Sequence, residues 1–378
     1  MRRKIVLTKK NNNILTTLIE NDEIVEIKVC KEKHENQFLV GNIYVGKVKN
    51  IVSNIEAAFI EIQKGVECYC QMEDKHLRVG DELLVQIKRE AAKGKVPTVT
   101  TKWSLQGQYA VLSVKDTRIG ISTKISKEKR EIFNELATPY VTKDYGFIIR
   151  TNAEHVEWEE VEKELTLLIA KYKHIHAIAD TRTCYSCLYQ QPAEYLSVLR
   201  NIRQEGLEEI IIEDIEIYNT VFAYLENFQS NALPLLKKYE DSLLPLQKLY
   251  AIDYTLEEGL KEKVWMKSGA YLVIQPTEAC TVIDVNTGKA IRKKDASLYI
   301  NLEAAKEVAR QIRLRNLSGI ILIDFINLLN VNDVRRLMKE LEYLLKRDPI
   351  PTTLVDMTKL QLVEITRQKI RKPLAESF

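Results

Sequence analysis

Apolar and polar residues alternate in short runs along the first hundred positions, a pattern that predicts β-strands. Three runs near the N-terminus cover residues 4–8, 14–20 and 23–29, and turn residues such as Asn11, Asn12 and Asn13 separate them. Five more runs cover residues 43–48, 57–62, 66–70, 82–88 and 97–102, with Gly80 and Asp81 before the fourth. Five short strands in about 60 residues are typical of a small barrel.

The middle of the chain changes to a mixed pattern. Strand-like runs at residues 109–114 and 146–150 accompany helical periodicity at 127–137 and 156–172, which predicts a small α+β module. A helix over 192–203, an apolar strand over 209–212 and a helix over 218–228 follow. We expect this last segment to rejoin the N-terminal strands.

The last third of the chain predicts a strand–helix–strand unit. Apolar strands cover residues 281–286 and 319–325, and Ser318 and Gly319 end the helix between them. The helix is expected to bury an apolar stripe spaced by four and three residues. The stripe consists of Leu298, Leu302, Ala305, Ala309 and Ile312.

Each of these two strands delivers an aspartate, Asp284 or Asp324, after its hydrophobic run. If the strands are parallel neighbours, both carboxylates reach the same edge of the sheet, where ligand sites of open α/β folds lie. A Mg²⁺ or Mn²⁺ ion would relieve the repulsion between the two charges, and Asn286 would share their face and orient a water or a phosphate oxygen. Spacing alone leaves open that both aspartates are turn residues.

Composition restricts the class of protein. Hydrophobic residues at 45% and charged residues at 29% are ordinary for a globular protein, and 378 residues suffice for two to four structural units. No apolar run approaches the roughly 18 residues of a membrane helix, and the run after the basic N-terminus is too short for a signal peptide. Six cysteines without a disulfide framework add to the expectation of a cytoplasmic protein.

Charge and isolated motifs change this interpretation little. The formal net charge is only +3, and the basic clusters taken alone predict solvated faces. Cys184 and Cys187 have the spacing of a zinc knuckle but no second pair, so no zinc is expected there. Cys68 and Cys70 should pack on one face of a strand. His174 and His176 lack any ligand pattern. The basic clusters are Lys88, Arg89, Lys93, Lys95 and Lys102; Arg292, Lys293 and Lys294; and Arg310, Arg313 and Arg315.

Three motifs in order resemble the ribonuclease E/G family: residues 283–288 (IDVNTG), 301–305 (NLEAA) with 309–315 (ARQIRLR), and 318–326 (SGIILIDFI). The resemblance extends to residues 41–47, 56–59, 146–151 and 364–368, so it covers nearly the whole chain. It implies an α+β fold in several subdomains. Residues 1–37 and 191–255 would form an RNase H-like subdomain, with an OB-type barrel at 38–103 inserted, a 5′-sensor module at 104–190, and a DNase I-like catalytic subdomain at 256–378.

The resemblance also implies roles for particular residues. Asp284 and Asp324 would hold one Mg²⁺, with Asn286 beside them, for hydrolysis that leaves 5′-phosphate and 3′-hydroxyl ends. In the barrel, Phe59, Tyr69 and Lys95 would contact unpaired, A/U-rich RNA, although Phe59 as a barrel-core residue is an alternative. The residues expected to line a pocket for a 5′-monophosphate are Gly107, Val111, Arg150 and Thr151.

The sequence departs from the family pattern at several positions. A pocket arginine of the family corresponds to Pro351, an acidic position after Asp324 is Asn327, and the loop 287–298 is short. The Cys-Pro-x-Cys zinc link is absent before Phe378, so a homodimer, if formed, is expected without zinc. The resemblance predicts an endoribonuclease of RNA processing or decay, and because of these departures two alternatives remain. One is a non-catalytic RNA-binding protein with a decayed site, and the other is an assembly factor that uses the barrel on the ribosome.

Overall fold

The computed structural model describes residues 2–32, 39–72, 76–89, 96–201, 205–289 and 296–377. Within these residues the chain forms two compact units. One unit combines Met1–Lys33 with Gly206–Phe378, and the other is His34–Glu205. Among the helices of these described ranges, none is both long and apolar enough to cross a membrane.

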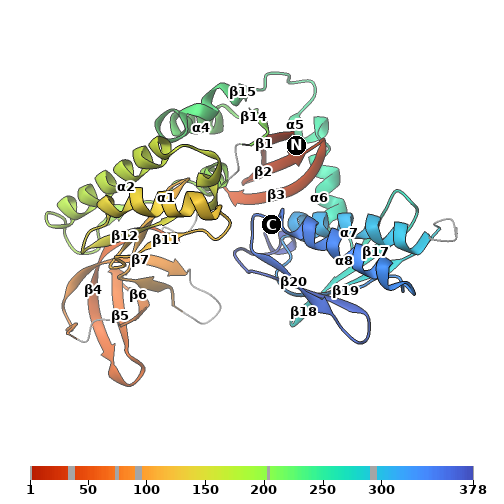
Figure 1. Ribbon diagram of the computed structural model, residues 1–378. Helices are drawn as coiled ribbons and strands as arrows, with labels where there is room; N and C mark the ends of the chain where they lie inside the picture. The colour runs from red at the N-terminus through yellow and green to blue at the C-terminus, as the bar shows by residue number, and fades with distance from the viewer. Residues whose placement is uncertain are drawn as a thin grey trace. The chain divides into compact units, whose positions relative to one another are not determined.

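The first unit begins with a sheet that combines the N-terminal strands with two strands from the middle of the chain. The hairpin strands pair in the order β1-β2-β3, and β14 joins β1 in parallel, as Figure 1 shows for the red strands and their green neighbour. The expected return of this later segment to the N-terminal strands is therefore confirmed. The elements are β1 (Arg3–Lys10), β2 (Asn13–Glu20), β3 (Glu23–Lys31), β14 (Leu207–Ile212), α4 (Ile215–Phe228), β15 (Leu236–Lys238), α5 (Leu246–Leu249) and α6 (Ile252–Leu260).

The second unit contains the expected barrel, which closes because β4 pairs with both β5 and β7. Alternate residues fill its interior, and Cys68 and Cys70 pack there at 0% and 2% exposure, which confirms their role in packing. The five strands of the barrel lie in the order β4-β5-β6-β8-β7, with both antiparallel and parallel neighbours. The elements are β4 (Ile43–Val52), β5 (Ala57–Gln63), β6 (Val66–Gln71), β7 (Glu82–Arg89) and β8 (Thr98–Thr100), with β13 (Cys187–Tyr189) against β4.

The rest of the second unit is the expected α+β module. Its strands pair in the order β11-β12-β10-β9, and the long helix α2 packs against β10. Trp103, Phe147 and Leu165 are among the buried residues of this core. The elements are β9 (Ser104–Gln106), β10 (Ala110–Val114), β11 (Ile119–Ile121), α1 (Lys127–Ala137), β12 (Tyr145–Ile149), α2 (Trp158–Ala179) and α3 (Glu194–Asn201).

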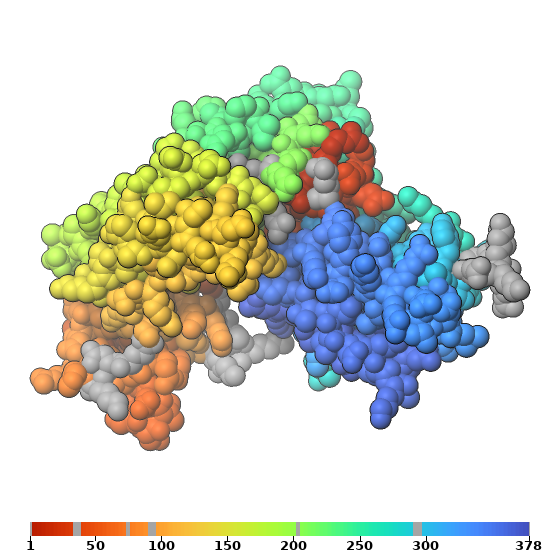
Figure 2. Space-filling model, in the orientation of Figure 1, coloured from red at the N-terminus to blue at the C-terminus, as the bar shows by residue number. Residues whose placement is uncertain are grey.

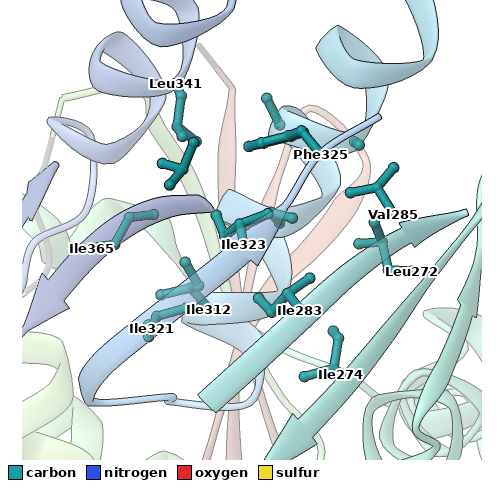
Figure 3. Close-up of a cluster of buried hydrophobic side chains, with 14 of the residues drawn as sticks. Leu272, Ile274, Ile283, Val285, Ile312, Ile321, Ile323, Phe325, Leu341 and Ile365 are labelled. Atoms are coloured by element: carbon teal, nitrogen blue, oxygen red, sulfur yellow. The ribbon is translucent and has the colours of Figure 1, made fainter. Parts of the chain in front are cut away.

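The C-terminal part of the first unit is a mixed sheet covered on one face by two helices. The strand order is β16-β17-β18-β19-β21-β20, and β18 and β19 are parallel, with α7 between them in the chain. Figure 3 shows Ile283, Ile321 and Ile323 on these strands beside Ile312 and Leu341 of the helices. The elements are β16 (Lys263–Trp265), β17 (Tyr271–Pro276), β18 (Cys280–Asn286), α7 (Ala296–Leu314), β19 (Gly319–Asp324), α8 (Val331–Leu345), β20 (Thr352–Met357) and β21 (Leu362–Arg367).

The buried stripe of α7 is shifted from the expected one. Ala305 and Ile312 are buried as predicted, but Leu298, Leu302 and Ala309 are only half-buried. The helix turns a neighbouring set of small and branched residues to the sheet. Figure 2 shows the outer surface of this C-terminal segment in blue. The fully buried set is Ile300, Ala304, Ala305, Val308 and Ile312.

Candidate active site

The two strand-terminal aspartates are direct partners in the register of the parallel pair, Asp284 of β18 opposite Asp324 of β19. Neighbouring strands lie about 4.8 Å apart, so the two carboxylates project side by side. The expectation that the two hydrophobic strands bring their aspartates to the same edge of the sheet is therefore confirmed. Turn residues would not share a ladder in this way, so the turn interpretation is wrong for this pair.

Both aspartates lie on the face of the sheet opposite the helices. Ile283 and Ile323, one position before each aspartate, are fully buried under α7 and α8. Because successive side chains of a strand point to opposite faces, Asp284 and Asp324 must face outward, and both are exposed. Burial of the isoleucines therefore fixes the direction of the acids.

Asn286 shares this face and contacts the first aspartate. Its Nδ2 donates a hydrogen bond of 2.7 Å to Oδ2 of Asp284. The amide thereby holds one orientation of the carboxylate. The sequence placed Asn286 on the correct face, and the structure adds its direct contact with Asp284.

A second asparagine, which the sequence did not single out as a site residue, supports the other aspartate. Asn301 of α7 is fully buried. Its Nδ2 donates to the carbonyl of Ile326 at 2.7 Å, and the Ile326 N–H donates to its Oδ1 at 3.1 Å. This reciprocal pair fixes the backbone two residues beyond Asp324, where the strand has ended. The signal was present in the 301–305 motif, but only the fold reveals its partner.

The donor set suits a hard divalent cation. Along the described part of the chain, no Lys, Arg or His side chain forms an ion pair with either aspartate, so like charges meet without a protein counter-charge. No group of three or more His, Cys, Asp or Glu residues suited to a metal occurs within those same described ranges. Two carboxylates with the remaining positions left to water and substrate match the preference of Mg²⁺, which keeps several waters.

The arginines of α7 do not form the solvated face that the charge pattern predicted. Arg310 donates to the carbonyl of Ile24 at 3.1 Å, and Arg313 donates to both carboxylate oxygens of Glu20 at 3.2 and 3.3 Å. Arg315 is 7% exposed, and burial lowers its pKa to about 10. Arg310 and Arg313 thus join α7 to the N-terminal strands, whereas Arg315, just after α7, donates to the carbonyl of Lys261 at 2.6 Å, and all three are structural. The cluster at residues 292–294 lies outside the described residues.

The barrel presents the two expected aromatics together. Phe59 and Tyr69 are register partners on β5 and β6, with ring centroids 6.2 Å apart in an edge-to-face arrangement. Both are half-buried, whereas the alternating neighbours Ile60 and Cys68 are at 0% exposure in the interior. Phe59 is therefore on the outer surface, and its interpretation as a core residue is wrong. Lys95, expected beside this pair, lies outside the described residues.

Two residues of the expected 5′-phosphate pocket, Arg150 and Gly107, are in direct contact, and the other two lie on neighbouring segments. Arg150 donates from Nη1 to the carbonyl of Gly107 at 2.7 Å, and its N–H bonds the carbonyl of Tyr109 next to β10, the strand that carries Val111. The hydroxyl of Thr151 lies 2.7 Å from that of Ser122. Arg150 and Thr151 therefore follow β12 in the chain, and their side chains bond different partners.

Glu164 is a central residue of this cluster that sequence reasoning missed. Its carboxylate accepts the backbone N–H groups of Gln108, Tyr109 and Ala110 at 2.5, 2.6 and 2.8 Å. A Cβ on Gly107 would lie 2.4 Å from its Cδ, so the glycine leaves room for the carboxylate. Burial raises the pKa of Glu164, and these N–H donors and Arg150 oppose the rise. No local pattern distinguishes it from the other glutamates of α2.

Three of the remaining candidate positions are exposed. Asn327 is exposed three residues after Asp324, and Pro351 is exposed, with its carbonyl accepting the Gln368 N–H at 3.0 Å. Cys187 is exposed, and the Cys184 sulfur lies 3.9 Å from the carbonyl of Val45. Much of the short loop after Thr287 lies outside the described residues.

Comparison with known proteins gives a consistent set of relatives. The model of the ribonuclease E/G family matches residues 104–370. Ribonuclease G of Salmonella typhimurium is 31% identical in an alignment of 368 positions that covers 90% of this chain and 75% of that protein. Ribonuclease G of Escherichia coli (strain K12) is 30% identical in an alignment of 370 positions that covers 91% of this chain and 75% of that protein. Ribonuclease E of a Nostoc species is 28% identical in an alignment of 399 positions, gaps included, that covers 100% of this chain and 57% of that protein.

Proposed function

Because this chain belongs to the ribonuclease E/G family and is an endoribonuclease, we propose that it hydrolyses single-stranded, A/U-rich RNA with Mg²⁺ at Asp284 and Asp324. The products would carry 5′-phosphate and 3′-hydroxyl ends. Its setting would be RNA processing or decay in the cytoplasm.

One observation supports the proposed site above all others: Asp284 and Asp324 are register partners on parallel strands, and both are exposed. Two carboxylates on neighbouring strands, whose backbones lie about 4.8 Å apart, repel unless a cation or a proton joins them. An ordinary surface would place a lysine or arginine between them. The absence of such an ion pair among the described residues leaves a binding position for an added cation.

The chain's own residues would hold and orient the reacting groups. The carboxylates of Asp284 and Asp324 would bind the ion, and Asn286 would keep Asp284 in its present orientation through the 2.7 Å hydrogen bond. When bound, Mg²⁺ would supply charge stabilisation at the phosphodiester and a water of lowered pKa. Manganese has the same hard-ligand preference and is the natural substitute.

The paired rings of Phe59 and Tyr69 would hold the RNA strand by stacking. An aromatic ring stacks on an unpaired base but cannot enter a paired helix, which favours single-stranded substrates. Stacking demands no particular base, so the preference for A/U-rich RNA would reflect the ease with which such segments remain unpaired. Lys95, which lies outside the described residues, would add attraction to the phosphates.

Arg150, Thr151, Gly107 and Val111 would bind a 5′-terminal monophosphate. A guanidinium fork and a hydroxyl suit phosphate oxygens. Arg150 now uses Nη2 for Oδ1 of Asn201 at 2.7 Å, and a bound phosphate would replace this partner. Glu164 would act indirectly, because its carboxylate fixes the backbone of residues 108–110, which borders the pocket.

A cleavage assay on a short, end-labelled, A/U-rich single strand tests this function. We expect internal cuts with Mg²⁺, none with excess EDTA, and products that a 5′-phosphate-dependent exonuclease degrades. A duplex of the same sequence is the matched control and should remain intact. Binding without any cut under Mg²⁺ or Mn²⁺ would instead identify a non-catalytic RNA-binding protein.

A further inference from the structure

The open face of the catalytic sheet also carries an aromatic and cationic cluster, formed by Lys263, Trp265 and Tyr271. The centroids of the Trp265 and Tyr271 rings are 5.0 Å apart. Nζ of Lys263 lies 3.6 Å from the Tyr271 centroid and 4.3 Å from the Trp265 centroid. Trp265 is 54% exposed, an unusual position for the largest apolar side chain. These three side chains form what we call the 263–271 cluster.

Strand register places this cluster in line with the aspartates. In one row across the sheet, Asp284 pairs with Val273 and Val273 with Lys263. In the next row, Asn286 pairs with Tyr271 and Tyr271 with Trp265. Residues directly opposite one another share a face, so the cluster and the acids lie on the same open surface.

The spacing between neighbouring strands is comparable to the spacing between successive bases of a nucleic-acid strand. Each strand of the sheet adds about 4.8 Å, so Tyr271 is one such step from Asn286 and Trp265 is two. Stacked bases lie about 3.4 Å apart along a strand, and unstacked bases lie farther apart. A base one or two nucleotides from a phosphate at the aspartates therefore reaches these rings.

The motif that carries Asp284 also fixes the position of Tyr271. Gly288 has φ +52, and a Cβ there would lie 2.4 Å from the carbonyl of Gly269 and 3.0 Å from Cδ1 of Tyr271. The Lys289 N–H donates to the same Gly269 carbonyl at 3.0 Å. The chain after Asn286 thus lies against one edge of the ring, which couples the cluster to the aspartate motif.

The side-chain chemistry selects one class of ligand. The exposed ring of Trp265 and the half-buried ring of Tyr271 offer stacking surfaces. Among the described residues, the ammonium of Lys263 contacts these two rings, and it offers a counter-charge for phosphate. We propose that Lys263, Trp265 and Tyr271 form a subsite that stacks a nucleobase of single-stranded RNA next to the phosphodiester at Asp284 and Asp324. This subsite rests on the proposed function, and it is separate from Phe59 and Tyr69 of the other unit.

Abasic scanning of the RNA tests the subsite. A short strand with one defined cut is made in versions that each lack the base at one position around that cut. At one or two positions beside the cut, loss of the base should lower kcat/KM of the wild type about ten-fold and that of Trp265→Ala much less. At every other position the two proteins should lose equally.

Two variants control this experiment. Trp265→Phe keeps a stacking ring and should behave as the wild type, whereas Tyr343→Ala removes a ring that is 60% exposed on α8 and should change nothing. If Trp265→Ala responds in parallel with the wild type at all positions, the subsite is refuted although cleavage continues.

Equilibrium binding separates this inference from the proposed function. The same RNA set is titrated into the wild type and Trp265→Ala, and Trp265 fluorescence is followed with Trp265→Phe as reference. One outcome would overturn the nuclease assignment and leave the subsite standing: no cleavage occurs, the RNA base quenches Trp265 fluorescence, and loss of that base raises Kd more in the wild type than in Trp265→Ala. Cleavage without either effect would overturn the subsite alone.

Discussion

Asn301 and Ile326 form two reciprocal hydrogen bonds, of 2.7 and 3.1 Å, between a buried side-chain amide and the backbone just beyond Asp324. Asn301→Ala removes both and leaves the Ile326 N–H and C=O without these partners. We expect a loss of about 1–3 kcal/mol in the free energy of unfolding. Because Asp324 would lose its fixed backbone, kcat should fall while KM for RNA changes little.

Asn301→Asp keeps the acceptor for the Ile326 N–H and loses the donor, but it places an unpaired carboxylate at a fully buried position. It should therefore destabilise the fold at least as much as Asn301→Ala and lower kcat to a similar degree. Asn227→Ala, which removes an exposed amide on α4, is the matched control. A folded Asn301→Ala variant with unchanged kcat would exclude a positioning role.

The buried ion pair of Arg367 and Asp348 should dominate the stability of the C-terminal layer. These side chains are 2% and 3% exposed, and Arg367 also donates to the carbonyl of Leu317 at 2.8 Å, just before β19. Arg367→Ala would leave a buried carboxylate unpaired, so unfolding by urea should show a loss of about 3–5 kcal/mol. Removal of the exposed Lys346–Glu342 pair by Lys346→Ala should change stability by less than about 1 kcal/mol. Equal effects of the two variants would contradict this ranking.

Glu61 should make the barrel sensitive to acid. Donation from the Tyr185 hydroxyl, then from the Gly65 N–H and Lys49, lowers the pKa of Glu61 from the ordinary 4.5 to about 2. A carboxyl with a depressed folded-state pKa stabilises the fold above its unfolded pKa, and this contribution disappears as the pH falls from about 4.5 towards 2. At pH 6 the wild type should have a larger free energy of unfolding than Glu61→Gln. This difference should decrease as the pH falls from about 4.5 towards 2. A gap independent of pH would show that the carboxylate charge has no part in it.

Arg150 should determine the response to the 5′ end of the RNA. We expect the wild type to cut 5′-monophosphorylated RNA about ten-fold faster in kcat/KM than 5′-hydroxyl RNA, a ratio typical of a lost charged hydrogen bond. Arg150→Gln should bring the ratio close to one without changing cleavage of 5′-hydroxyl RNA. Arg182→Gln, at an exposed arginine after α2, should preserve the preference. An unchanged ratio in Arg150→Gln would remove this residue from the pocket.

The aspartate pair was predictable because the signal is local and geometric. Each acid follows an uninterrupted apolar run, and a helix of suitable length separates the runs, so parallel pairing was the simple outcome. The outward direction of Asp284 and Asp324 follows from alternation with buried isoleucines. The motifs resembling the ribonuclease E/G family pointed to the same two residues.

Contacts between distant segments could not be predicted in this way. Glu164 is one of several glutamates on α2, and only the fold brings it to residues 108–110. Arg313 resembles a solvated charge in the sequence, yet it bonds Glu20, nearly three hundred residues earlier. The strands β16 and β17 were not foreseen either, and the pairing of Trp265 with Tyr271 depends on them. Hydrophobic periodicity reports which face is buried, and it carries no information on such partners.

The central claim is that Asp284 and Asp324 perform the chemistry while other residues bind the RNA. The most direct measurement compares Asp284→Asn and Asp324→Asn with the wild type in cleavage and in RNA affinity, using one end-labelled strand with Mg²⁺. The account predicts that each variant loses cleavage by about a thousand-fold or more, as expected for loss of a group that stabilises transition-state charge, with Kd within a few-fold of the wild type. Cleavage that persists in both variants would contradict it.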